Sequence, residues 1–223
     1  MRAYSSRSYS RMATVVLLPI LLAHPGCGSS SGPQKTAEDF AEDGWVKFAS
    51  ENYSAALDDF LEATSMDSEY ADGYLGAGWA SLYLKRPQDA LSHFSIGLSK
   101  ASDSSTLADL YAGDALTNLE LEQYSLCISG VNACFAIVPS YVFPRQPSVN
   151  RIDLKVAQAN AYFQLGGDSN LAKAADLVHE ADVRIALDPE TPESWRVDGT
   201  TYGTFSEALL RALEQVSEMA ASS

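Results

Sequence analysis

Apolar residues recur at every third or fourth position along the chain from Thr36 onward. This spacing places them on one face of an α-helix. Almost no segment alternates β-branched with polar residues, the pattern that a half-buried strand would show. The pattern therefore predicts an all-α fold made of successive amphipathic helices.

The helical pattern repeats itself after 34 residues. A shift of 34 makes residues at helix-packing positions coincide: Phe40 with Tyr74, Gly44 with Gly78, Trp45 with Trp79, Ala56 with Ala90, Leu57 with Leu91, Phe60 with Phe94, and Ala63 with Gly97. Glycine or alanine at such positions lets two antiparallel helices approach closely, and phenylalanine fills the gap between repeats. Because one helix pair cannot bury these residues alone, the pairs must stack on one another.

The period of 34, the glycine in the first helix and the Ala-x-x-x-Phe pattern in the second resemble the tetratricopeptide repeat. The resemblance implies an α-solenoid of antiparallel helix hairpins, with about three clear repeats and a divergent fourth hairpin. The first helices of successive repeats would line a concave groove. The residues expected to pack the repeats together are Gly44, Ala56, Phe60, Gly78, Ala90, Phe94, Cys127 and Cys134.

The third repeat follows after a three-residue insertion. Tyr124 takes the role that Tyr53 has where the first repeat's second helix begins, and Val131 replaces the phenylalanine. Cys127 and Cys134 occupy the two small-residue positions. Seven residues apart on one helix, they lie about 10.5 Å apart along its axis, beyond the roughly 7 Å reach of a disulfide. Both are therefore expected to be small core residues.

The repeat pattern breaks beyond Pro139. Residues 139–151 hold three prolines within nine positions, so this stretch cannot be helical and is expected to run extended over the surface. A fourth hairpin is predicted over residues 152–165 and 169–187.

A last helix is predicted near the C-terminus. Thr204 and Glu207 form a capping-box pair that opens it. Stacks of repeats need a terminal element with a polar outer face, and this helix suits that role. The predicted division is a repeat domain over residues 37–203 and a capping helix over residues 204–223.

The first 26 residues have the order of a secretory signal. Arg2, Arg7 and Arg11 come without any acidic residue and precede an apolar run over residues 12–23. That run is too short to cross a bilayer as a permanent helix. Residues 1–26 are therefore predicted to be a signal peptide that directs export.

Cys27 follows a glycine and precedes the sequence GSSSG, which resembles the processing site of a bacterial lipoprotein. In that family the cysteine is acylated and the peptide is cut just before it. The resemblance implies lipidation of Cys27, a flexible tether over residues 27–36, and a place on the bacterial envelope, at the periplasmic side of the outer membrane. The alternative is an exported, unanchored periplasmic protein in which Cys27 is incidental.

The charge of the chain limits its partners. Removal of residues 1–26 takes away three of 15 basic residues and none of 29 acidic ones, which leaves 12 − 29 = −17. Such a chain is not expected to bind nucleic acid or anionic lipid headgroups by charge. Membrane attachment is expected to depend on the lipid.

No motif for catalysis or for a cofactor stands out. The only nucleophile-like match, Gly-x-Ser-x-Gly at residues 28–32, lies in the predicted tether and lacks the strand-to-helix turn that this chemistry needs. His93 and His179 are far apart and lack the spacing of a zinc site. The chain is therefore expected to be no enzyme and to hold neither a cofactor nor a metal.

A binding groove can be assigned by the resemblance. Its expected residues are Trp45, Trp79 and Leu116, then Phe48, Leu82 and Leu119 one turn further along, with Glu38, Asp72 and Asp109 near the helix starts. They form an aromatic and aliphatic stripe with an acidic edge, which favours an apolar or basic segment as ligand. The alternative is that Trp45 and Trp79 pack against the next repeat and are not exposed.

The predicted function is the binding or scaffolding of envelope proteins or peptides through this groove. The alternative is a small-ligand component of an envelope transporter, in which the stripe encloses an apolar molecule. A closed cavity would favour the small ligand, and an open groove would favour a peptide.

Overall fold

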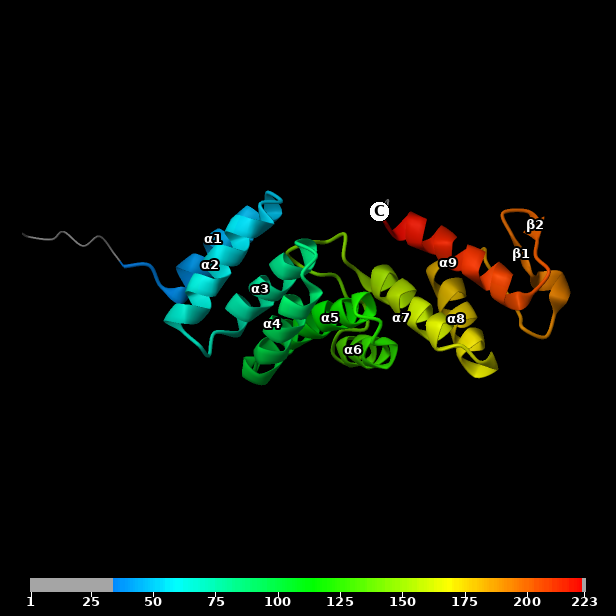
Figure 1. The fold of residues 1–223 in the computed structure, drawn as a ribbon, viewed down its shortest axis with the longest axis horizontal. Helices are drawn as coiled ribbons and strands as arrows, with labels where there is room; N and C mark the ends of the chain where they lie inside the picture. Colours follow the sequence, from blue (N-terminus) through cyan, green and yellow to red (C-terminus); the bar gives the residue numbers. More distant parts are fainter. Residues whose placement is uncertain (1–33, 222–223) are drawn as a thin grey trace, which may run out of the picture. The chain divides into compact units, whose positions relative to one another are not determined.

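The predicted helices form a series of antiparallel hairpins. The structure is a computed structural model and describes residues 34–221. Its elements are α1 (Ala37–Ala49), α2 (Tyr53–Met66), α3 (Ala71–Tyr83), α4 (Pro87–Lys100), α5 (Ser104–Glu120), α6 (Tyr124–Ile137), α7 (Arg151–Leu165), α8 (Asp168–Ala181), a 3-10 turn at Pro192–Ser194, β1 (Arg196–Val197), β2 (Thr200–Thr201) and α9 (Phe205–Ala221). Each odd-numbered helix from α1 to α7 pairs with the next helix, and α9 ends the series (Figure 1). The all-α solenoid predicted from the sequence is confirmed.

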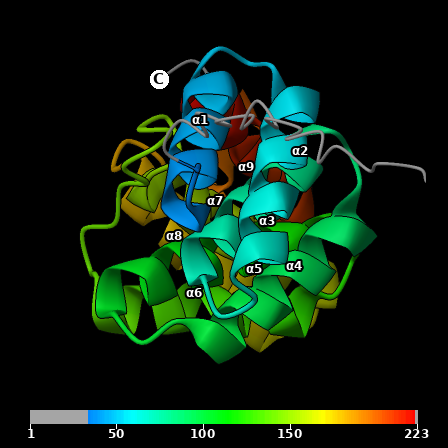
Figure 2. The same ribbon diagram turned by 90° about the vertical axis from the view of Figure 1, so that its left-hand side faces the viewer.

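The hairpins stack in chain order, so that the first helix of each contacts the first helix of the next. These contacts join α1 to α3, α3 to α5, α5 to α7 and α7 to α9. Figure 2 faces the first hairpin, with α1 and α2 side by side in front. The first helices therefore share one face of the stack, which is the concave face expected of this repeat.

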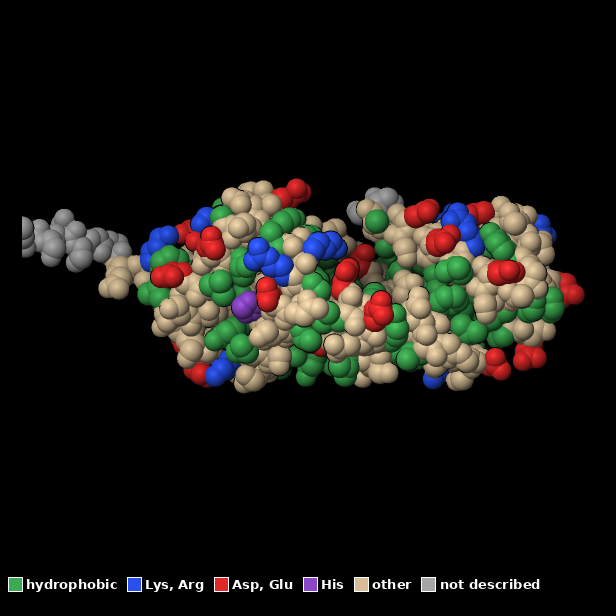
Figure 3. All heavy atoms as spheres, viewed as in Figure 1, with side chains coloured by type: hydrophobic (Ala, Val, Ile, Leu, Met, Phe, Trp, Pro, Cys, Tyr) green, Lys and Arg blue, Asp and Glu red, His purple; other side chains and the backbone are tan. Residues whose placement is uncertain are grey.

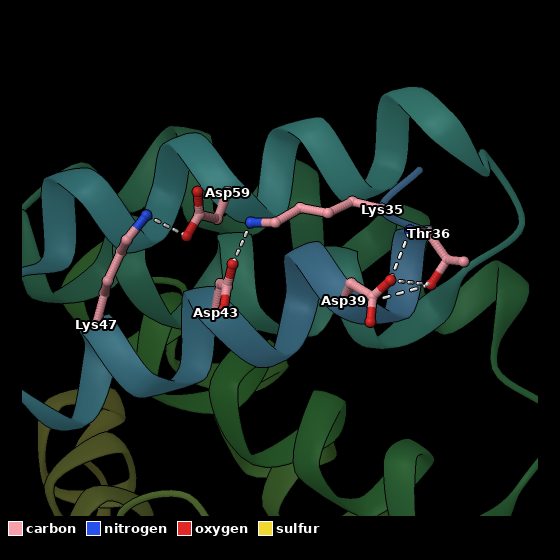
Figure 4. Close-up of polar contacts among 6 residues, drawn as sticks. All are labelled: Lys35, Thr36, Asp39, Asp43, Lys47 and Asp59. Carbon is pink, nitrogen blue, oxygen red and sulfur yellow. Dashed lines mark hydrogen bonds and ion pairs between the residues drawn. The ribbon is translucent and has the colours of Figure 1, made fainter. Parts of the chain in front are cut away.

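Polar contacts fix the start of the first hairpin (Figure 4). The Thr36 hydroxyl accepts a hydrogen bond from the Asp39 amide at 3.2 Å, and the Asp39 carboxylate accepts one from the Thr36 amide at 2.8 Å. This reciprocal capping box satisfies two amides at the start of α1. An ion pair between Lys47 and Asp59 then joins α1 to α2.

The ring of Phe60 lies between two glycines that belong to consecutive repeats. A Cβ atom at Gly44, in its own repeat, would come within 2.7 Å of the ring, and one at Gly76, in the next repeat, within 2.2 Å. Real Cβ atoms do not approach a carbon so closely. The ring can thus be fully buried only because neither neighbour carries a side chain.

In the second repeat a phenylalanine ring again lies between two glycines, whereas the third repeat has a smaller side chain in place of the ring. Phe94 lies between Gly78 and Gly113, where added Cβ atoms would come within 2.5 and 2.3 Å of the ring. In the third repeat, Ala115 stands at the position of Gly78 and Val131 at that of Phe94, and both are fully buried. A larger residue on one helix is matched by a smaller one on its neighbour.

Cys127 and Cys134 are free thiols on α6, and both are completely buried. Burial raises the pKa of each thiol to about 12. Both therefore stay neutral and pack as small apolar residues.

The second helix of the fourth hairpin is shorter than predicted. It ends at Ala181, six residues before the expected end at residue 187. The Asp182 carboxylate accepts hydrogen bonds from the main-chain amide of Arg184 at 3.0 Å and from its guanidinium at 2.7 Å. A carboxylate that binds the amide two residues on forms a turn that competes with the helix. The following Ile185 is buried in the core around α9.

The C-terminal helix closes the stack. Thr204 and Glu207 form the predicted capping box, with amide-to-side-chain distances of 3.1 and 3.2 Å. One face of α9 packs on α7 and α8 and buries Phe205, Leu209 and Leu213 among others.

The sequence-predicted signal peptide and Cys27 lie outside the described residues. None of the described helices is both long and apolar enough to span a membrane.

Substitution of Gly78 by alanine tests the fit between glycine and phenylalanine. Helix propensity favours alanine by about 1 kcal/mol, but overlap with Phe94 is expected to cost more, for a net loss of about 2 kcal/mol in the free energy of unfolding.

Urea denaturation of Gly78→Ala, of Phe94→Val and of the double variant measures the coupling between the two positions. The double variant should be more stable than the sum of the single effects by about 1 kcal/mol or more. Additive effects would contradict the proposed fit, and Gly203→Ala, whose Cβ would meet nothing closer than 3.4 Å, serves as the control.

Candidate functional site

Part of the concave face of the first three repeats is covered by the chain's own proline-rich segment (residues 139–150). The stretch is non-helical and most of its residues are exposed, as predicted, but Tyr141 and Phe143 are buried against the repeats, at 1% and 0% exposed. The Phe143 ring stacks on Trp79 with centroids 4.5 Å apart and planes 19° apart. It also meets Trp45 edge-on at 6.0 Å. Phe143 therefore occupies the stripe between the two tryptophans.

Arg145 continues the contact along the same stripe. Its guanidinium lies 5.0 Å above the Trp45 ring, a distance that allows a cation–π interaction. It also forms an ion pair with Glu42 on α1 at 3.8 Å. The segment thus places a positive charge at the acidic edge of the groove.

The two tryptophans below the segment differ in their hydrogen bonding. Trp45 donates its indole N–H to the Asp72 carboxylate of the next repeat at 2.9 Å. The equivalent pair one repeat later would join Trp79 to Asp109. Among the described residues, however, the Trp79 Nε1 is buried without a hydrogen-bond partner.

Asp109 lies beside Tyr141 and is only 8% exposed. Burial raises the pKa of its carboxyl to about 6, and the charges of Asp72 and Asp103 add to this shift. Tyr141 and Arg145 oppose it. Burial and the Asp109 charge also raise the pKa of Tyr141. The carboxyl of Asp109 is therefore poised to change its charge in mildly acidic solution.

The segment holds its shape mainly through bonds within itself. The amide of Phe143 donates to the Val149 carbonyl at 2.8 Å, and the amide of Val149 donates to the Gln146 carbonyl at 2.8 Å. Within the part of the chain that the structure describes, the main chain of residues 140–149 makes no hydrogen bond to a helix. Apart from its covalent connections to α6 and α7, its side chains therefore hold it on the repeats.

Beyond the segment, part of the concave face is open. A pocket of about 250 Å³ lies beside Val149 and is lined by Trp79, Leu82, Tyr83, Lys85, Leu116, Leu119 and Glu120. A second hollow of about 240 Å³ shares Leu116 and Leu119 with it and extends to α7 and the end of α9. In Figure 3 the surface is hollowed between the first hairpins and the C-terminal end of α9, and acidic and basic side chains are interspersed around it.

The sequence-predicted groove residues thus fall into two groups. Trp45, Phe48 and Trp79 are at most 4% exposed, which agrees with the alternative that the tryptophans are packed. Leu82, Leu116 and Leu119 are half-buried and line the open pocket. The acidic residues differ as well, since Glu38 is exposed, Asp72 binds Trp45, and Asp109 is buried.

Sequence reasoning missed the residues of the segment itself. The buried Tyr141 and Phe143 alternate with the exposed Val142 and Pro144. Large side chains at every second position of an extended segment lie on one face, so the alternation indicated that this face would be covered. The three prolines favoured a surface loop, and the alternation was not considered.

The described residues carry little that could act in catalysis. No group of three or more histidine, cysteine or acidic residues among residues 34–221 is placed to hold a metal ion. The Asp109 carboxyl faces Tyr141, whose raised pKa keeps its hydroxyl protonated. The site offers stacked rings, an acidic edge and an apolar pocket, which are features of binding.

Comparison with known proteins identifies the fold. No model of a protein family and no curated protein matches the chain. Among solved structures, YrrB, described as a TPR protein with an unusual peptide-binding site, is 17% identical, with a TM-score of 0.56 over 83% of this chain and 89% of that one. MamA from Desulfovibrio magneticus RS-1 is 17% identical, with a TM-score of 0.55 over 86% and 98%.

A third similar structure is the Cut9–Hcn1 hetero-tetramer of the APC/C. It is 16% identical, with a TM-score of 0.57 over 80% of this chain, and this chain spans 30% of the length of the matched chain. At such identities the likeness shows the fold alone. The chain has the tetratricopeptide-repeat fold.

Replacement of Asp109 by asparagine tests the cost of the buried carboxylate. Since the pKa is raised from 3.8 to about 6, the folded state binds the proton more tightly than the unfolded state does. The resulting stability is fully present below about pH 4 and is lost as the pH rises through about 6. Asp109→Asn should thus raise the free energy of unfolding by about 2 to 3 kcal/mol at pH 7.5 and change it little at pH 4.

Urea denaturation at the two pH values measures this difference. The exposed Asp58→Asn provides the control, which should show the same small effect at both. An equal effect of Asp109→Asn at pH 4 and pH 7.5 would show that the carboxyl is not titrating in the folded chain.

Proposed function

We propose that this chain is a non-catalytic scaffold that binds protein partners of the bacterial envelope through its concave face. The observation that carries the proposal is the open apolar pocket around Leu82, Leu116 and Leu119. Large half-buried apolar side chains that converge on a concave surface are typical of a binding site. Lys85 and Glu120, paired at 3.6 Å, lie at its edge and provide polar groups that can orient a ligand.

The shape of the open surface favours a chain-like ligand over a small molecule. The pocket is open to solvent, and the second hollow is adjacent to it, since Leu116 and Leu119 line both. Two linked hollows suit successive side chains of one peptide. A small apolar ligand of a transporter would instead be expected in one enclosed cavity.

Attachment to the membrane is part of the proposal and rests on the sequence. The charged and then apolar order of residues 1–23 and the glycine before Cys27 support export and acylation of that cysteine. Two or more acyl chains anchor a protein stably, whereas one chain does not. The glycine and serine residues that follow would separate the folded repeats from the bilayer.

A paired substitution tests the binding role of the pocket. Leu82→Glu with Leu116→Glu introduces two charges into it and is expected to abolish capture of specific partners from an envelope extract, read by quantitative mass spectrometry. Leu61→Glu with Ile96→Glu, at exposed positions of α2 and α4, serves as the matched control and should capture them as the native chain does. Equal capture by both pairs of variants would exclude the pocket as the site, provided that both retain a cooperative helical melt.

The mass of the mature chain tests the anchor. The protein purified from membranes should begin at Cys27 and carry the added mass of two or three acyl chains. Cys27→Ser should abolish the added acyl mass and the cut before residue 27. An unmodified N-terminus in the native protein would contradict anchoring and leave an unanchored exported scaffold.

A further inference from the structure

The proline-rich segment occupies the repeats in the manner of a peptide ligand. It is extended, it presents Tyr141, Phe143 and Arg145 to the concave face at every second position, and its main chain bonds only within the segment among the described residues. Apart from its covalent connections to α6 and α7, the segment is held on the groove by the buried Tyr141, by ring stacking on Trp79, by contact with Trp45 and by the ion pair with Glu42.

The fit of this segment is incomplete in one place. The Trp79 Nε1 is buried without a partner, although the equivalent Trp45 Nε1 donates to Asp72 at 2.9 Å. A buried donor that lacks an acceptor weakens the bound state, so a ligand that placed an acceptor beside the Trp79 Nε1 would compete with the segment.

From this geometry we infer that the groove between Trp45 and Trp79 accepts an extended segment of a partner protein with an aromatic ring two residues before an arginine, in place of residues 141–145. This inference rests on the proposed scaffold function and names the chemistry of the partner. The ring takes the place of Phe143 on Trp79. The guanidinium takes that of Arg145 over Trp45 and beside Glu42.

The acidic edge supports a basic ligand at this place. Glu42 and Asp72 lie on α1 and α3, and Arg145 is the cation that faces both. A chain with a net charge of −17 after residue 26, from 12 basic and 29 acidic residues, attracts basic segments further.

A peptide supplied in trans tests the inference. The probe is the fluorescently labelled peptide PSYVFPRQPSVN, which copies residues 139–150, and the readout is fluorescence anisotropy with the full chain. The double variant Phe143→Ala and Arg145→Ala empties the groove of both side chains. It should bind the peptide about tenfold or more tightly than the native chain does, because in the native chain the internal segment competes. A control peptide with alanine in place of its phenylalanine and arginine should not bind.

Several outcomes would overturn the inference. A folded double variant that does not bind the peptide, or that binds the control peptide equally, would show that the groove recognises neither group. If size-exclusion chromatography shows that two native chains exchange these segments, the occupant is a second copy and not a partner.

A second variant tests the same groove without removing Phe143. Should the double variant lose its helical melt, Arg145→Glu leaves Phe143 in the core while it places a negative charge beside Glu42. This variant should bind the peptide more tightly than the native chain, and unchanged binding by the folded variant would equally overturn the inference. The capture experiment uses other residues, Leu82 and Leu116. Failure of the peptide test would therefore overturn this inference only, and the scaffold function would be decided by the capture experiment.

Discussion

The stack depends on phenylalanine rings that enter gaps left by glycines of two consecutive repeats. Gly44 and Gly76 flank Phe60, and Gly78 and Gly113 flank Phe94, at distances where a single added carbon would overlap the ring. Each ring therefore packs on the first helix of its own hairpin and on the first helix of the next hairpin. Because each ring needs both glycines, no hairpin can bury its own apolar residues without its neighbour, which is the condition for a one-dimensional stack.

The same stacking places the first helices of the repeats side by side and creates the concave face. This face carries the rings of Trp45, Phe48 and Trp79, which would leave a large apolar surface in water. The proline-rich segment removes that surface from solvent with Phe143 and Tyr141. The covered part of the groove and the open pocket beside Val149 are thus two sections of one concave surface.

The repeated part of the fold could be predicted from the sequence because it follows from spacing. The glycine, alanine and phenylalanine positions recur after 34 residues, and a helix that starts at Tyr53 or ends near Pro139 follows from that register. The leucines of the pocket could be placed in the same way. Where the period ends, prediction became less accurate, since the end of α8 depends on a turn made by Asp182 and Arg184.

The segment over the groove could not be placed, because its position depends on contacts between residues far apart in the chain. Three prolines correctly exclude a helix, but they do not say whether an extended stretch covers a surface or enters a groove. The alternation of Tyr141 and Phe143 with Val142 and Pro144 indicates a buried face, yet only the tryptophans of α1 and α3 show what that face meets. The unpaired Trp79 Nε1 is likewise a property of the packed structure.

Hydrogen exchange of the native chain tests the central claim that the proline-rich segment occupies the groove. The amides of Phe143 and Val149 donate to carbonyls within the segment and lie against the repeats. The account predicts that both exchange about a hundredfold or more slowly than in an unstructured chain, and faster than the central amides of α3, because local opening costs less than global unfolding. Exchange at the rate of an unstructured chain would contradict the account and leave the groove between Trp45 and Trp79 open.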